Sequence, residues 1–225
     1  MIHSEITGRG PALLLTHGFT GSSRDWAKLV GPLAEAHTVI TWDLRGHGKS
    51  GAPDDPAQYS VELALGDMAA LLDRAGAERA VLVGHSLGGF LSLAFRLAHP
   101  ERVRALALVD TGPGYRKDDA RTGWNRMVEK RAAELAQRGA LGLAHAARGI
   151  LAQRDGRVIE SLAAIDVPTL VVVGEHDEPF LAGSSYMAEK ISGAKLEVIA
   201  GAGHSPQETH PEPVLAAVRE LLARA

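Results

Sequence analysis

Residues 80–88, Ala-Val-Leu-Val-Gly-His-Ser-Leu-Gly, are the most informative stretch of this chain and indicate its chemistry. An apolar run, typical of a strand, leads directly into the pattern Gly84-x-Ser86-x-Gly88. Small residues two positions before and after a serine allow a tight turn between a strand and a helix, from which the hydroxyl projects at the edge of a sheet. A side chain at position 84 or 88 would collide with neighbouring backbone in such a turn. We therefore expect Ser86 to be a nucleophile; the other interpretation is an ordinary glycine-rich end of a strand.

Short apolar runs recur along the chain, bounded by glycine or proline. Most are apolar at every position, which is typical of strands buried on both faces of a parallel sheet. The runs predicted as strands are Ala12–Thr16, Thr38–Trp42, Ala80–Gly84, Val103–Val109, Thr169–Val173 and Lys195–Ile199. Helical patterns between them cover Asp25–Ala36, capped by Ser23, the residues from Ser60 to Ala75, Leu87–Ala98 and Pro211–Ala223. This alternation predicts an α/β fold with a mostly parallel sheet and helices on both of its faces.

The alternation stops between residues 112 and 166, which contain two helical patterns and no strand pattern. These helical patterns are Asp118–Arg138 and Leu141–Gln153. We predict a core domain of residues 1–111 and 167–225, with a short helical cap inserted at 112–166. Residues 116–157 contain 10 Lys and Arg against 5 Asp and Glu. A solvated helical face and a basic lid that attracts an anionic substrate both explain this excess.

The composition excludes several classes of function. A formal net charge of −3 and an apolar fraction of 45% are ordinary for a soluble globular protein and give no reason to expect nucleic-acid binding. The chain contains no cysteine, so disulfides and thiolate chemistry are excluded. The sequence shows neither a signal-peptide pattern nor an apolar run of the roughly 20 residues that span a bilayer. We expect a cytoplasmic protein with no membrane partner.

Two loops downstream of Ser86 contain the groups that a serine nucleophile needs. A serine hydroxyl is a poor nucleophile at neutral pH, and it needs an adjacent base that is itself oriented by a carboxylate. Asp177 lies in the loop after one predicted strand, and His204 lies in the loop after the next. Because the carboxyl ends of parallel strands meet at one edge of a sheet, we expect Ser86, Asp177 and His204 to lie close together there.

These motifs resemble those of the α/β-hydrolase superfamily. Thr16-His-Gly-Phe-Thr-Gly-Ser22 is similar to the oxyanion loop of the family, and Asp43-Leu-Arg-Gly-His-Gly-Lys-Ser50 is similar to the loop after the next strand. The order serine, acid, histidine along the chain is also that of the family. The resemblance covers nearly the whole chain. It implies a catalytic triad of Ser86, Asp177 and His204 and an oxyanion hole formed by the backbone N–H groups of Phe19 and Leu87.

Other residues compete for roles in this site. Glu175, Glu178 and Asp110 are the remaining candidate acids, and Asp110 follows a strand at a position that some relatives use. His17 is expected to hold the oxyanion loop, and His85 is expected to have a packing role. The ten histidines form no metal-ligand pattern such as His-Glu-x-x-His, so no metal and no other cofactor is predicted.

The resemblance implies hydrolysis of a small-molecule carboxylic ester through an acyl-enzyme. Phe90, Trp124 and Met127 are the candidates for the wall of the substrate pocket. A C–C hydrolase or a lyase acting on an anionic substrate is the alternative, because residues 17–22 and Trp26 are similar to the menaquinone-pathway synthase that eliminates pyruvate. That family usually has arginine where this chain has Phe90. A second alternative is a binding module on the same fold that catalyses no reaction.

Overall fold

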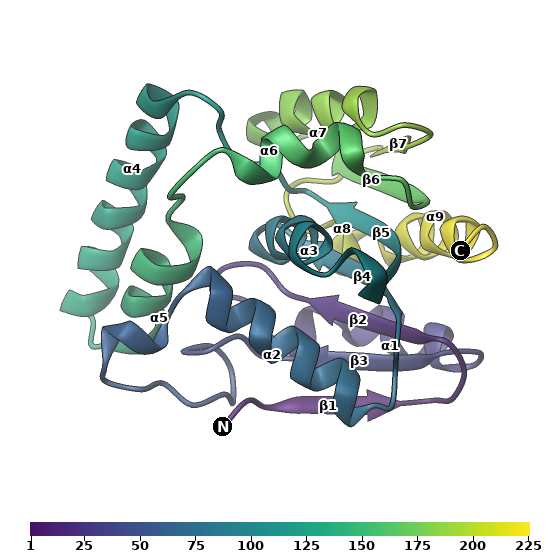
Figure 1. Cartoon of the computed structure of the whole chain (residues 1–225), viewed down its shortest axis with the longest axis horizontal. Coiled ribbons are helices and arrows are strands. Elements are labelled where there is room, and N and C mark those ends of the chain that lie inside the picture. Colours follow the sequence, from purple (N-terminus) through teal and green to yellow (C-terminus); the bar gives the residue numbers. More distant parts are fainter.

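A computed structural model describes all 225 residues. One sheet of seven strands, in the order β1-β3-β2-β4-β5-β6-β7, runs through the molecule (Figure 1). The strands are β1 Ser4–Thr7, β2 Ala12–Thr16, β3 Thr38–Trp42, β4 Ala80–His85, β5 Val103–Val109, β6 Thr169–Gly174 and β7 Lys195–Ile199. Strands β2 to β7 pair in parallel, and β1 pairs antiparallel with β3. The predicted α/β class with a mostly parallel sheet is therefore confirmed.

The sequence analysis missed β1. This strand consists of Ser-Glu-Ile-Thr, lies at the edge of the sheet, and is mostly exposed. An edge strand hydrogen-bonds on one side only and buries little surface, so it needs no apolar run and leaves no periodic pattern.

Helices cover both faces of the sheet because successive side chains of a strand point to opposite faces. In β2, Leu13 and Leu15 pack with α1 (Ala27–Ala34) and α9 (Pro211–Leu222). Leu14 points to the other face and packs with α2 (Val61–Arg74) and α3 (Leu87–Ala98). Helix α7 (Glu178–Lys190) covers that same face with Met187. Figure 1 shows α2 and α3 in front of the sheet and α1 behind it.

The first helical region begins differently from its prediction. Ser22, not Ser23, is the cap: its hydroxyl accepts from the N–H of Arg24, and its own N–H donates to Asp25. A 3-10 turn at Ser23–Trp26 precedes α1. Two adjacent serines offer the same capping chemistry, and the side chain of Asp25, at the third position after Ser22, selects between them by completing a capping box.

The segment 112–166 contains only helices and turns. It comprises α4 Asp118–Gln137, α5 Leu141–Ala146, a π-helical turn Ala147–Leu151, α6 Arg157–Ser161 and a 3-10 turn Leu162–Ala164. The helix predicted at Leu141–Gln153 is α-helical only to Ala146 and continues as the π-helical turn, in which Gly149 packs closely against the Tyr59 carbonyl. In Figure 1, α4 and α5 lie beyond the carboxyl ends of the parallel strands. A small apolar cluster that contains Leu135 and Ala144 joins these two helices.

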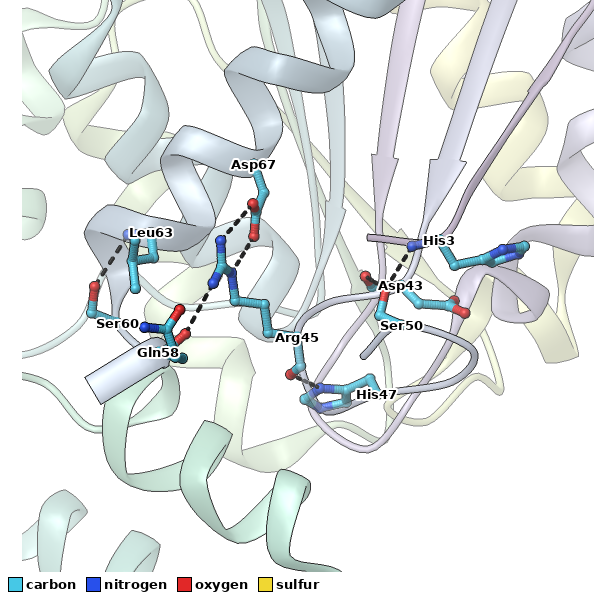
Figure 2. Close-up of polar contacts among 9 residues, drawn as sticks. All are labelled: His3, Asp43, Arg45, His47, Ser50, Gln58, Ser60, Leu63 and Asp67. Atoms are coloured by element: carbon cyan, nitrogen blue, oxygen red, sulfur yellow. Dashed lines mark hydrogen bonds and ion pairs between the residues drawn. The ribbon is translucent and has the colours of Figure 1, made fainter. Parts of the chain in front are cut away.

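The loop after β3 is held by its own polar contacts (Figure 2). Arg45 donates two hydrogen bonds to Asp67 of α2, at 2.6 and 2.9 Å. Asp43 accepts from the backbone N–H groups of Ser23 and Lys49 at 2.6 and 2.7 Å. His47 donates to the carbonyl of Arg45 at 3.0 Å. These residues fix the loop itself, so we assign them a structural role.

Three further short elements complete the chain. They are the 3-10 turns Pro56–Gln58 and Pro100–Arg102 and the helix α8 at Pro206–Thr209. No helix of the protein combines the length and the apolar character that crossing a bilayer requires.

Candidate active site

Ser86 occupies a strained turn between β4 and α3. Its backbone has φ 50° and ψ −115°, a conformation that residues other than glycine rarely adopt. A Cβ on Gly84 would lie within 3.0 Å of the Gly88 carbonyl, and a Cβ on Gly88 would lie within 3.0 Å of the Thr16 carbonyl. Thr111 holds the turn from the next strand, because its hydroxyl donates to the carbonyl of Ser86 at 2.6 Å. Both glycines of the motif are therefore required by packing.

Three loops at the carboxyl edge of the sheet bring Ser86, His204 and Asp177 together. Nε2 of His204 lies 3.1 Å from Oγ of Ser86, and Nδ1 lies 2.8 Å from Oδ2 of Asp177. A carboxylate only accepts, so Nδ1 carries the proton and Nε2 is free to accept from the serine hydroxyl. Asp177 is buried, whereas His204 is partly exposed and stacks on Phe180 with ring centroids 4.9 Å apart. This hydrogen-bond chain has the geometry of an activated nucleophile.

His85 connects the serine turn to the loop of His204. Its Nε2–H donates to the backbone carbonyl of His204 at 2.6 Å. Burial lowers the pKa of His85 to about 4, so the ring is neutral at pH 7. The His85 side chain therefore does more than pack, because it holds in place the backbone of His204.

The loop after β2 lies directly against Ser86. His17 fixes this loop, because its Nδ1–H donates to the Gly18 carbonyl at 2.6 Å and its Nε2 accepts from the N–H of Leu44 at 3.0 Å. Burial lowers the pKa of His17 to about 3, which keeps the ring neutral. A Cβ on Gly18 would lie 3.2 Å from the Cβ of Ser86. Phe19, whose backbone N–H was predicted to contribute to the oxyanion hole, directly follows Gly18 in this loop.

The first N–H group of α3 belongs to Leu87, directly after Ser86. The first N–H groups of a helix have no acceptor within the helix. The helix dipole also favours negative charge at this end. The surroundings of Ser86 can thus stabilise an oxyanion.

Asp110 contacts Asp177 rather than His204. It ends β5 with φ 43°, is fully buried, and accepts from the N–H of Gly174 at 2.9 Å. Burial and the hydrogen bond with Asp177 raise the pKa of Asp110 to about 8. Two carboxyl groups in contact do not ionise together at neutral pH, so Asp110 holds the proton and donates it to Asp177.

The two other candidate acids lie elsewhere. Glu175 accepts from the N–H of Gly201 at 2.8 Å, and Glu178 is exposed at the first position of α7. Neither has a hydrogen bond to His204, so Asp177 is the acid that the geometry pairs with this base.

A metal would need the same atoms as the hydrogen-bond network. Asp110, Asp177 and His204 offer ligand atoms within 4.8 Å of one another. Oδ2 of Asp177 already bonds His204, and Oδ1 of Asp110 bonds the backbone of Gly174. The cluster fits a proton-transfer network better than a cation site, and we assign no metal to it.

A cavity of about 240 Å³ opens beside Ser86. Phe90 and Trp124 line it, as do Tyr115 and Gln153. None of the side chains that line this cavity is charged.

Met127, which was expected in the wall of the pocket, lies outside the cavity with 52% of its surface exposed. The inner face of α4 is formed by Val128, Ala132 and Leu135, and Met127 falls beside that face.

The sequence analysis missed several residues of the site. Thr111, Tyr115, Gln153 and Phe180 line the cavity. The positions of Thr111, just after β5, and of Phe180, just after the loop of Asp177, were signals that they lie at this edge. Nothing in the sequence marks Tyr115 or Gln153, because both reach the site through irregular segments next to α4 and α6.

Comparison with known proteins identifies the family. The sequence model of the family described as "alpha/beta hydrolase fold" matches residues 11–158. A provisionally named carbamate hydrolase, RutD of Pseudomonas savastanoi pv. phaseolicola, is 31% identical over 94% of this chain and 93% of its own length. The chain belongs to the α/β hydrolase fold family. Asp177 and His204 lie beyond the matched residues, so their roles in this hydrolase fold depend on the geometry above.

Two other relatives of this α/β hydrolase cover nearly its whole length. One is a provisionally named 2-succinyl-6-hydroxy-2,4-cyclohexadiene-1-carboxylate synthase of Bacillus subtilis, 27% identical over 96% of this chain and 93% of its own. The other is the structure of a thermophilic esterase from Thermogutta terrifontis, with a TM-score of 0.84 and 29% identity, covering 99% of this chain and 93% of that chain. Proteins similar to this hydrolase thus have names from more than one class of reaction.

Proposed function

We propose that this α/β hydrolase is a serine hydrolase that cleaves small carboxylic esters through an acyl-enzyme. The observation that carries the proposal is the continuous chain from Ser86 Oγ to Nε2 of His204, at 3.1 Å, and from Nδ1 of His204 to Asp177, at 2.8 Å. The strained turn of Ser86 at the N-terminus of α3 supports the same role.

Each group in the site has a role in the proposed reaction. Oγ of Ser86 attacks the ester carbonyl while His204 takes the hydroxyl proton, and Asp177 stabilises the imidazolium that forms. The backbone N–H groups of Phe19 and Leu87 donate to the oxyanion, at about 3 kcal/mol each. His204 then gives its proton to the leaving alcohol. Water, activated by the same histidine, attacks the acyl-enzyme, which releases the acid and restores Ser86.

The lining of the cavity favours an uncharged substrate. An anion placed beside Ser86 would lose its hydration and find no cationic side chain in the cavity wall. No basic residue of the segment 116–157 lines this cavity, and most of them, such as Arg126, Lys130 and Arg138, are exposed to solvent. The interpretation of this excess as a solvated helical face is therefore the better supported one.

The second candidate is a lyase that eliminates pyruvate. The full-length similarity to the Bacillus subtilis synthase favours it. The uncharged cavity, and Phe90 in place of the arginine of that family, count against it. Incubation with the synthase substrate and measurement of released pyruvate tests this reaction directly. Release of pyruvate at enzymatic rates would show that elimination, and not ester hydrolysis, is the function.

The decisive experiment is labelling and replacement of Ser86. We expect wild-type protein to react with a fluorophosphonate probe and to hydrolyse p-nitrophenyl acetate. We expect Ser86→Ala to lose labelling and roughly 10⁶-fold in kcat, as serine-protease nucleophile variants do. Ser161→Ala, in α6 and outside the cavity, is the matched control and keeps both. Full activity of Ser86→Ala would exclude the mechanism, and a wild-type protein that fails to label would favour a binding module.

A further inference from the structure

A second cavity lies on the far side of Phe90 and Gln153. These two residues line both cavities and separate them. The cavity beside Ser86 measures about 240 Å³ and the second about 310 Å³. Pockets for small molecules commonly range from about 300 to 1,000 Å³, so the first is small alone while the two joined fall within that range.

The lining of the second cavity is mainly apolar and its charges balance. Leu65 of α2, Ala94 of α3 and Val158 of α6 form part of its wall. Its charged members are two acids and two bases: Glu62, Asp155, Arg154 and Arg157. Arg157 pairs with Asp155 at 2.8 Å. With no net charge to neutralise, this cavity is suited to an uncharged apolar group.

Phe90 and Gln153 form the partition between the two cavities, and they are held in different ways. Gln153 is fixed by hydrogen bonds, whereas Phe90 can change its rotamer. Oε1 of Gln153 accepts from the N–H of Tyr115 at 3.1 Å. Asn125 accepts from the backbone N–H of Gln153 at 2.9 Å and donates to its carbonyl at 2.8 Å. Phe90, in contrast, is a partly buried side chain held only by packing, and it lies one helical turn after Ser86. A rotation of the Phe90 side chain would therefore join the two cavities next to Ser86.

We propose that the cavity beyond Phe90 and Gln153 is a second subsite that binds the distal apolar part of an extended ester. The substrate class is an uncharged ester whose acyl or alcohol group is longer than the cavity beside Ser86 can hold. This inference rests on the proposed function, because it assumes that the ester carbonyl is held at Ser86.

Filling the second cavity tests the subsite. Ala98 is exposed on α3 and lines only the second cavity. We expect Ala98→Trp to leave kcat/KM for p-nitrophenyl acetate unchanged and to lower kcat/KM for long substrates by about fourfold per excluded methylene. A p-nitrophenyl series from acetate to decanoate extends the acyl side, and an alkyl acetate series extends the alcohol side. Ala98→Ser is the matched control with wild-type profiles in both.

Removing the Phe90 ring tests the subsite by opening the partition instead of filling the second cavity. We expect Phe90→Ala to raise the ratio of kcat/KM for decanoate to kcat/KM for acetate at least tenfold, the value of about two buried methylenes. Unchanged chain-length profiles of both Ala98→Trp and Phe90→Ala would overturn the subsite. If the wild-type protein hydrolyses no ester at all, the proposed function is overturned instead. The failure of the subsite and the failure of the proposed function are therefore distinguishable.

A crystal structure of the covalent adduct locates the chain directly. An octyl phosphonate ester bound to Ser86 has an alkyl group long enough to reach the second cavity. We expect its distal carbons to lie between α2 and α6, past a rotated Phe90. A chain that extends into solvent or toward Phe180 would contradict the inference.

Discussion

The carboxyl edge of the sheet and the helical segment 112–166 face each other across Ser86, yet they are built very differently. At the edge, backbone lies so close that a Cβ on Gly88 would overlap the Thr16 carbonyl. In α4, a Cβ on Gly123 would meet nothing within 4 Å, and only Val128, Ala132 and Leu135 of its 20 residues are buried. The edge is tightly packed around Ser86, whereas most positions of α4 have room for a different side chain.

After the replacement of Ser86 itself, the largest expected effect separates the two acids at the edge. We expect Asp177→Asn to lower kcat by roughly 10,000-fold, because an amide stabilises the wrong histidine tautomer and no imidazolium. Asp110→Asn should stay within a few-fold of wild type, since an amide reproduces the protonated carboxyl and asparagine tolerates a positive φ. Steady-state kinetics on p-nitrophenyl acetate measures both. Equal losses in the two variants would show that Asp110 carries a charge that catalysis needs.

One substitution made in both regions tests the contrast directly. Gly88→Ala should lower the free energy of unfolding by about 3 kcal/mol or more, because the methyl group has no space. Gly123→Ala should raise it by about 0.5–1 kcal/mol, because alanine is the better helix former and the site is open. Urea denaturation measures both values. A Gly88→Ala protein as stable as wild type would mean that the backbone at the edge can shift to make room for a methyl group.

The pH dependence of stability reports the proton on Asp110. Its pKa is raised by burial from the ordinary value near 4 to about 8, so between these values the folded protein binds one more proton than the unfolded chain. The stabilisation is present below pH 4 and is lost as pH rises to 8. Compared with Asp110→Asn, wild type should therefore lose up to about 1.4 kcal/mol per pH unit in that window. Parallel stability curves for the two proteins would exclude a proton shared by the carboxyl pair.

The smallest effects are expected in the helical segment. Trp124→Ala removes a side chain that lines the cavity and donates to the Leu151 carbonyl at 3.0 Å, so kcat/KM should fall about tenfold, mainly through KM. Met127→Ala, three residues along the same helix but largely exposed, should change kcat/KM less than about twofold. Comparable losses in both variants would mean that Met127 also contacts the substrate and belongs to the pocket wall.

Sequence reasoning succeeded where local chemistry alone determines structure. The apolar strands and the glycines around Ser86 are required by burial and close contact, so their pattern predicts the parallel sheet and the strained turn. The loops of Asp177 and His204 follow from the rule that carboxyl ends of parallel strands meet at one edge.

The missed features depend on contacts between distant segments. β1 is defined by pairing with β3, and the π-helical turn lies where Gly149 packs against Tyr59, a contact between segments about 90 residues apart. The exposure of Met127 depends on how α4 rotates against α5, which helical spacing alone does not set. The proton on Asp110 depends on contact with a carboxyl group 67 residues away in the chain, at Asp177. No periodicity encodes that contact.

The hydrogen bond from His85 to the His204 backbone has a consequence for engineering. His85 is covalently adjacent to Ser86, so this hydrogen bond links the loops of Ser86 and His204 directly even though β5 and β6 separate their strands. Because neither residue of this link lies in the helical segment 112–166, we expect a segment transplanted from a relative to change which substrates are accepted while the bond between the two loops is kept.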